Sequence, residues 1–193
     1  MMVFFTPFWK RFDLAALLLA FALAASSVFA VQPHGIEVER AAFVAADDHY
    51  VLEADIEIVL SAPLEDALKK GIPLYFTLEF ELVRARWYWF NEKAIAQQQQ
   101  YRLSFNALTR QYRIGVGAFY QNFPVLADAL QFMSKVRRRE DLESGALSKG
   151  TSYTAGLRLR LDTSQLPRPF NLNALGSREW SLGSDWYRWT VTP

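Results

Sequence analysis

GIPLYFTLEFELVRARWYWF, residues 71–90, is the most strongly patterned stretch of the chain. Its first half alternates apolar and polar side chains, which is the period-two pattern of a half-buried β-strand. After Leu82 the pattern inverts, and Arg84 and Arg86 take the parity that had been apolar. Because a slip of one residue moves every side chain to the other face, we predict a bulge, a twist or a change of sheet between Leu82 and Arg84. This stretch is predicted to be the central strand of a β-domain.

Further strands and two helices are predicted around it. Alternation predicts strands over residues 36–44, 50–60, 94–107, 112–116 and 153–161, with an interruption at Gln97–Gln100. The final segment, 180–191, is rich in aromatic residues. A short helix is expected from Ser61 to Gly71, between a capping residue and a helix-ending glycine. A medium helix is expected over 124–138, with Asn122 as its cap and apolar side chains at three- and four-residue steps. The predicted fold is all-β, a mainly antiparallel β-sandwich of roughly seven to nine strands, immunoglobulin-like in general architecture, with one short and one medium helix.

The N-terminus has the three-part layout of a secretory signal peptide. Lys10 and Arg11 precede an apolar run over 14–25, and small residues lead up to Ala30. The run is shorter than the ~20 residues that span a bilayer. We therefore predict a signal peptide over residues 1–30 with cleavage after Ala30, a single β-sandwich domain over 31–193, and a periplasmic location. The alternative is an uncleaved N-terminal helix that anchors the chain to the inner membrane.

Charge and cysteine content limit the classes of function. Removal of residues 1–30 leaves 21 − 2 = 19 Lys and Arg and 20 − 1 = 19 Asp and Glu, a net charge of zero. A neutral balance argues against nucleic-acid binding, which scales with the phosphates neutralised. The chain has no cysteine, which excludes a thiol nucleophile, thiolate metal ligands and a lipidated N-terminal cysteine.

Charged side chains alternate with apolar ones along the predicted strands. If the strands share one sheet, the acids form a row that faces a complementary set of arginines: Glu53, Asp55, Glu57, Glu79 and Glu81 opposite Arg84, Arg86, Arg102, Arg113, Arg158 and Arg160. Carboxylates along a strand are spaced about 7 Å apart, unlike a loop wrapped around one cation. Cross-strand ion pairs are therefore expected rather than a metal site.

The candidate binding surface combines cations with large aromatic rings. Its members are Arg84, Arg86, Trp87, Trp89, Trp186 and Trp189. Arginine and tryptophan dominate the energetics of protein interfaces, so exposed rings here would bind a glycan, a peptide or another protein. The alternative is that the tryptophans fill the ends of the sandwich core, as tryptophan is usually much buried.

Other features carry weaker functional signals. Lys135–Arg139, placed at the end of the predicted medium helix, would either touch anionic lipid or complement the helix dipole. The two histidines, His34 and His49, are not at metal-ligand spacing. No nucleophile elbow or phosphate-binding loop is present in the sequence. We therefore expect no enzymatic activity, no metal and no cofactor, with an enzyme site assembled from loops as a remaining alternative.

The chain resembles a family of exported bacterial proteins classed as domain of unknown function 4390. The resemblance rests on the signal peptide, on a tryptophan-rich C-terminus, and on the strings Gly71-Ile72-Pro73-Leu74, Arg86-Trp87-Tyr88-Trp89, Tyr101-Arg102-Leu103-Ser104 and Asn106-Ala107-Leu108-Thr109. None of these strings has an assigned chemistry. Genes of this family neighbour a membrane sensor histidine kinase, so the resemblance implies an accessory that modulates the kinase's extracytoplasmic part.

The predicted function is a periplasmic, non-enzymatic binding or protein-interaction module. Its expected partner is an envelope protein, which the resemblance suggests to be a membrane sensor kinase. The alternative is a module that binds a cell-wall glycan, peptide or lipid through an aromatic groove. Membrane contact is expected only through an uncleaved signal segment or the Lys135–Arg139 region.

Overall fold

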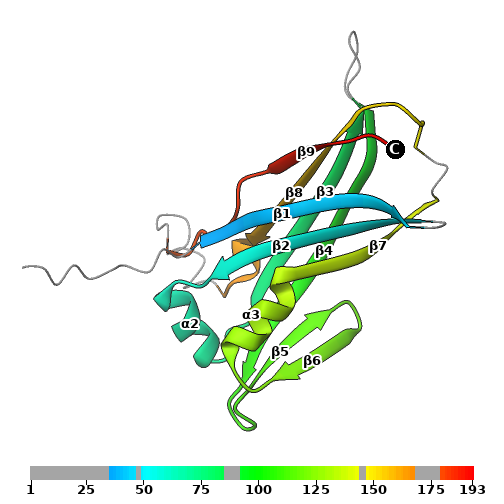
Figure 1. Ribbon diagram of the computed structural model, residues 1–193. Helices are drawn as coiled ribbons and strands as arrows, with labels where there is room; N and C mark the ends of the chain where they lie inside the picture. Colours follow the sequence, from blue (N-terminus) through cyan, green and yellow to red (C-terminus); the bar gives the residue numbers. More distant parts are fainter. Residues whose placement is uncertain (1–34, 47–48, 85–91, 144–146, 168–178) are drawn as a thin grey trace, which may run out of the picture. The chain divides into compact units, whose positions relative to one another are not determined.

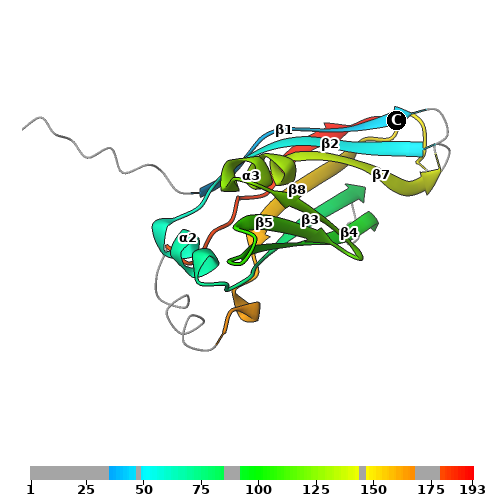
Figure 2. The same ribbon diagram turned by 90° about the horizontal axis from the view of Figure 1, so that it is seen from below.

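The computed structural model describes residues 35–46, 49–84, 92–143, 147–167 and 179–193. Two antiparallel sheets pack face to face (Figures 1 and 2). The smaller sheet has the order β1-β2-β7, with β1 at Gly35–Ala46, β2 at His49–Val59 and β7 at Lys135–Glu143. The larger sheet has the order β6-β5-β4-β3-β8-β9. Its strands are β3 at Leu74–Arg84, β4 at Glu92–Asn106, β5 at Gln111–Val116, β6 at Phe119–Phe123, β8 at Tyr153–Leu161 and β9 at Tyr187–Val191. The described part of the chain is thus the predicted β-sandwich.

The central strand lies where the sequence predicts it. β3 pairs with β4 on one side and with β8 on the other. A register shift in the β3–β4 ladder falls between Leu82 and Val83, because Leu82 pairs with Ile95 and Val83 with Lys93. The extra residue, Ala94, is in β4, whereas the β3–β8 ladder stays in register. The predicted irregularity is confirmed, and it is a bulge of the neighbouring strand.

The short helix is confirmed as α2, Ala62–Lys69. Ser61 occupies its N-cap position, but the hydroxyl makes no capping bond. It donates instead to the carbonyl oxygen of Glu179 at 2.5 Å. Gly71, at φ +85°, follows the helix in the conformation that glycine adopts without strain. Leu64 and Leu68 are fully buried, so the helix closes one end of the core.

The medium helix is shorter than predicted. α3 covers Leu126–Ser134, and Lys135 begins strand β7. Asn122 does not cap it but lies in β6, where its side chain accepts a hydrogen bond from Arg113. The helical periodicity through Val136 was misleading because the same valine also fits a strand whose arginines pair with acids of β2. The basic run is therefore an edge strand and not a helix end.

One apolar core lies between the two sheets. β3 contributes its alternate side chains, all at most 1% exposed: Leu74, Phe76, Leu78, Phe80 and Leu82. Phe80 lies 5.2 Å from the ring of Phe43 in the opposite sheet and 6.2 Å from the indole of Trp189. Aromatic contacts at these centroid distances are favourable in addition to the burial of area. Phe80 therefore links both sheets.

The predicted row of acids is divided between the two sheets. Glu53, Asp55 and Glu57 lie on β2, and Glu79 and Glu81 lie on β3. The cross-strand pairing itself is found on both sheets. The Glu79 carboxylate pairs with both Arg158 and Arg160 on β8. Among the described residues no group of three or more metal-ligating side chains is found.

Within the described residues, no helix is both long enough and apolar enough to span a membrane. The predicted signal peptide, residues 1–30, lies outside the described residues.

Candidate functional site

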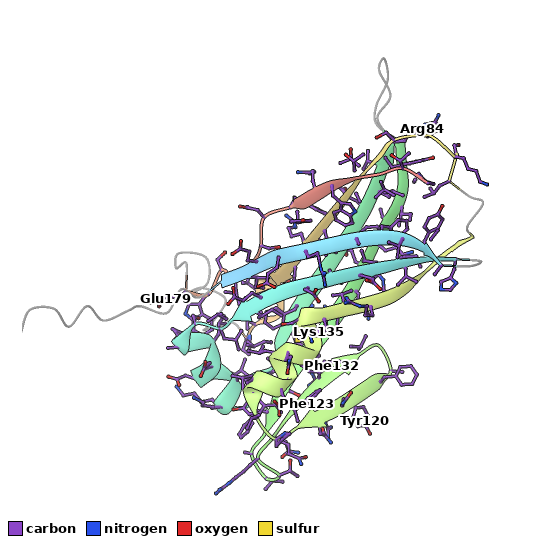
Figure 3. All side chains as sticks on the ribbon, viewed as in Figure 1. Arg84, Tyr120, Phe123, Phe132, Lys135 and Glu179 are labelled. Atoms are coloured by element: carbon purple, nitrogen blue, oxygen red, sulfur yellow. The ribbon has the colours of Figure 1, made fainter. Side chains whose placement is uncertain are left out.

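The predicted binding surface is only partly contained in the described residues. Arg86, Trp87 and Trp89 lie outside them. Arg84 is half-buried at the end of β3. Figure 3 shows it at the upper end of the larger sheet, with Tyr120 of β6 toward the lower end.

Trp186 packs on the outer face of the larger sheet. Two guanidinium groups contact its ring, that of Arg158 at 4.6 Å and that of Arg188 at 5.6 Å from the centroid. Beneath it is Gly156, where an added Cβ would come within 3.2 Å of the indole. Cation–π contacts of this kind contribute about 0.5–1 kcal/mol each at exposed sites. The Trp186 ring therefore already makes its aromatic contacts within the protein.

Substituting Gly156 by valine should displace that indole. The new side chain would also meet the Glu81 Cγ at 3.3 Å, so both neighbours have to move. We expect a loss of about 1–2 kcal/mol in unfolding free energy, as for other over-packed sites, and a red shift of the Trp186 fluorescence obtained by difference from a Trp186→Phe background. The matched control is Gly35→Val, because nothing lies within 4 Å of a Cβ at Gly35. An unchanged difference spectrum would contradict the packing described.

Trp189 faces the other side of the sheet. It pairs in register with the buried Ala155, and its ring packs against Phe80 at 6.2 Å and Tyr187 at 5.8 Å. Trp180 is buried as well. The two described members of the predicted platform, Trp186 and Trp189, therefore do not form one surface. For Trp180 and Trp189 the structure favours the alternative that tryptophans complete the core.

A large hollow lies elsewhere on the described surface, around the first half of β4. It has a volume of about 760 Å³ and is called the edge groove here. Its lining comes from β3, β4, β5, β6 and β7: Tyr75, Gln97, Gln98, Gln99, Gln100, Arg102, Ser104, Arg113, Gly115, Gly117, Phe119, Tyr120 and Arg138. Most of these groups are polar, and the groove is wide and open.

A second hollow of about 740 Å³, the inter-sheet cleft, lies on the other side of the same strand. It is lined by Gln99, Tyr101, Val116, Phe119, Phe123, Asp128, Gln131, Phe132, Lys135, Val136, Arg137 and Arg138. The groove and the cleft share Gln99, Phe119 and Arg138. The two hollows therefore meet at one edge of β4.

That edge is uncovered because β5 is short. β5 pairs only with the second half of β4, and the last pair is Tyr101 with Val116. Gly117, at φ +57°, then reverses the chain into β6. From Ile95 to Gln100, β4 pairs with β3 on one side. On the other side, from the bulged Ala94 to Gln100, it pairs with no strand of the described residues. A strand in the middle of the sheet thus becomes an edge strand for seven residues.

A buried ion pair lies at the junction of the groove and the cleft. Arg138 Nε donates to Glu140 Oε1 at 2.6 Å, and the Glu140 side chain is fully buried. Arg138 Nη2 and Glu140 Oε2 are also buried, and neither has a hydrogen-bond partner in the structure. Burial raises the pKa of the nearby Tyr101 phenol, and the positive charge of Arg138 opposes that rise. Unsatisfied buried polar atoms are costly and often mark a functional position.

Exposed apolar side chains gather beside these hollows. The apolar patch comprises Phe119 and Tyr120 in β6, which are 83% and 68% exposed, and Val125 and Phe132 at α3, which are 50% and 43% exposed. The two elements are neighbours, and the rings of Phe123 and Phe132 are 5.4 Å apart. Figure 3 shows Tyr120, Phe123 and Phe132 at this end of the molecule.

The charges around the two hollows are mostly positive. Arg102 and Arg113 line the groove, and Lys135 lines the cleft, where Asp128 is the one lining carboxylate among the described residues. Arg137 is neutralised by Glu53 and Asp55. Arg102 and Arg113 instead lie over the rings of Tyr75 and Tyr120, at 5.8 and 4.7 Å. Lys135 pairs in register with Asp55, and its charge helps to lower the pKa of that carboxyl. The edge groove contains arginines and no described carboxylate, so it presents positive charge.

The sequence interpretation missed this region. No strand was predicted at Phe119–Phe123, which is β6, and no binding role was assigned to the strand that contains Gln97–Gln100. A usable signal was present, since Gly117 and Ala118 separate two short alternating runs with the spacing of a hairpin. The uncovered edge had no comparable signal, because it depends on where β5 stops relative to β4.

Fold and site together define an all-β sandwich module with an open-edged surface groove. The chain belongs to the family described as Domain of unknown function (DUF4390), whose model matches residues 34–190. No curated protein and no solved structure matches the chain. The resemblance noted in the sequence is thus confirmed at the level of the family.

Proposed function

We propose that this protein is an extracytoplasmic, non-enzymatic interaction module that binds another protein of the cell envelope. The apolar patch carries the proposal. Phe119 is 83% exposed and Tyr120 68%, next to an open groove of about 760 Å³. Large apolar side chains that gather at the surface mark interaction sites, and aromatic residues dominate interface energetics.

The location in the periplasm is part of the proposal. It is supported by the N-terminal sequence, in which two cations, an apolar run and small residues before Ala30 follow the order of a signal peptide. The absence of cysteine is compatible with that compartment, because a domain with an extensive core does not need disulfides.

The partner that we propose first is the extracytoplasmic part of a membrane sensor kinase. This identity rests on the family resemblance alone. The geometry supports only the coarser statement that the partner is a macromolecule, since the two hollows are broad and open rather than enclosed.

Binding of a cell-wall glycan is the less favoured alternative. Sugar recognition needs free aromatic faces for stacking. In the edge groove, guanidinium groups lie over the rings of Tyr75 and Tyr120. Trp186, farther along the same face, contacts two more. These contacts favour a protein partner over a sugar.

The proposal predicts position-specific cross-linking in living cells. A photo-reactive amino acid at Phe119 or at Phe132 should give an adduct of one discrete mass in the envelope fraction, because both positions lie on the apolar patch. Leu108, which is 96% exposed at the β4–β5 turn, is the matched control and should give none. Mass spectrometry of the adduct identifies the partner.

Equal labelling from all three positions, or none from any, would contradict the proposal. The double substitution Phe119→Ser and Phe132→Ser should also remove the adduct formed from a reporter at Tyr120. The variant's thermal unfolding should stay close to that of the native chain, since exposed side chains contribute little to stability.

A further inference from the structure

We propose that the uncovered edge of β4, Ala94–Gln100, binds an acidic, extended segment of the partner protein as an added β-strand. This inference rests on the proposed function and specifies how the partner is held. The added strand would lie beside β4 in line with β5, in the position that β5 leaves vacant after Val116.

The backbone of β4 supplies the first argument. Every second residue of a strand directs its N–H and C=O toward one side, so along these seven residues the groups on that side have no partner in a described strand. The segment is about 23 Å long at roughly 3.3 Å per residue. Ala94, Ala96, Gln98 and Gln100 are exposed, so their side chains do not cover the edge. Strand addition to such an edge is an established mode of peptide recognition, in which backbone hydrogen bonds provide affinity.

The two hollows supply the second argument, because they lie on the two sides of this edge. Side chains of an added strand would point alternately into the edge groove and into the inter-sheet cleft. Gln99, Phe119 and Arg138 line both hollows, so the space is continuous around the edge. The cleft also contains Phe123, Phe132 and Val136. Apolar side chains of the added strand fit there.

Charge supplies the third argument and selects the occupant. The groove is lined by Arg102 and Arg113 and by no described carboxylate. Lys135 lines the cleft, where Asp55 on β2 offsets part of its charge. An added strand that alternates Asp or Glu with apolar residues would place its acids over the arginines. Electrostatic complementarity of this kind favours specificity and a fast association rate.

The Arg138–Glu140 pair supports the same location. Arg138 lines both hollows and its side chain is 18% exposed, whereas the Glu140 side chain behind it is fully buried. An added strand passing the edge would therefore contact the Arg138 side chain.

The test uses a defined peptide and the protein as isolated from cells. The probe is a synthetic ten-residue peptide that alternates glutamate with valine or phenylalanine. Hydrogen exchange measured by mass spectrometry should show protection of residues 94–100 when the peptide is present. Residues 112–116 of β5, which already pair on both sides, serve as the internal reference and should not change.

Two peptide controls separate strand addition from charge attraction. A peptide with lysine in place of every glutamate should bind at least about tenfold more weakly, as expected when charge complementarity is reversed. The second control is a pair of peptides, each with N-methyl groups on one of the two alternate sets of residues. In one of the two, the methyl groups replace the N–H donors that face β4, and this peptide should give no protection. Simple charge attraction would tolerate either methylation.

A protein variant provides the reciprocal control. Arg102→Glu combined with Arg113→Glu should weaken binding of the acidic peptide by about tenfold or more and strengthen binding of the lysine peptide. Lys70→Glu, which changes an exposed cation beyond α2, should alter neither.

The outcomes distinguish this inference from the proposed function. Adducts at Phe119 and Phe132 without protection of 94–100 by the acidic peptide would overturn strand addition and leave the interaction module standing. Protection that appears without peptide as the protein concentration rises, together with a dimer in sedimentation analysis, would overturn it in favour of a second copy of this chain. Protection lost with the N-methylated peptide and with the arginine variant supports it.

Discussion

Replacing Phe80 by alanine is expected to lower the free energy of unfolding by about 3–5 kcal/mol, the range found for large aromatic side chains in a packed core. Phe80 is 1% exposed and contacts Phe43 across the sandwich and Trp189 in its own sheet. The cavity left by the missing ring would therefore lie between the two sheets. Neither sheet could move in to fill it without displacing the other. Chemical denaturation followed by circular dichroism measures the effect.

The matched control for this experiment is Phe119→Ala, the same substitution at a position that is 83% exposed. It should change the unfolding free energy by less than about 0.5 kcal/mol. Similar losses at both positions would contradict the placement of Phe80 in the core and of Phe119 at the surface.

Glu79→Gln should cause the second large effect, a loss of about 2–3 kcal/mol. The Glu79 side chain is 9% exposed and binds both Arg158 and Arg160. A glutamine keeps the size but gives up the charge-assisted hydrogen bonds, which contribute about 1.5–3 kcal/mol. The two arginines are 31% and 42% exposed, so water compensates part of the loss. Glu57→Gln, an exposed glutamate on β2, is the control and should have little effect.

The same carboxylate predicts a dependence on pH. Burial by itself would raise the pKa of Glu79, but hydrogen bonds and the charges of Arg158 and Arg160 outweigh burial and hold this pKa below its usual value of 4.5. A carboxyl whose pKa is lowered by folding stabilises the native state above its unfolded pKa and loses that contribution as the pH falls through its folded pKa. The difference in stability between the native chain and Glu79→Gln should be constant above about pH 5.5 and shrink at lower pH. A difference that grows in acid would contradict the ion pair.

The fold could be predicted from the sequence wherever one face of a strand is buried. β3, β2 and β8 each alternate between apolar and polar side chains, and burial of the apolar set determines the register. An irregularity was predicted beside Leu82, and the β3–β4 ladder has one there. The extra residue lies in β4, so it does not account for the inverted pattern of β3, which stays in register with β8.

The boundary at Lys135 could not be predicted in the same way. Val136 continues the helical spacing of α3 and also alternates with the arginines of a strand. Tertiary pairing with β2 decides between the two, since Arg137 meets Glu53 and Asp55 there. Local patterns do not contain information on such a contact.

The candidate site was predicted less well than the fold. The sequence interpretation selected tryptophans, and the described ones either pack in the core or contact arginines. Arg102 and Arg113 were recognised only as members of a charged set. Their place beside an uncovered edge follows from the length of β5, which is a property of the sheet and not of any single residue.

The uncovered edge of β4 has a consequence for the behaviour of the protein at high concentration. An unpaired strand that carries four consecutive glutamines is a template for edge-to-edge association, because glutamine side chains form ladders when identical strands stack in register. The bulge at Ala94 twists one end of this segment, and the cations beside it repel a second copy. Screening by salt weakens that repulsion. Precipitation should therefore begin at this edge, and an occupied edge should keep the protein in solution.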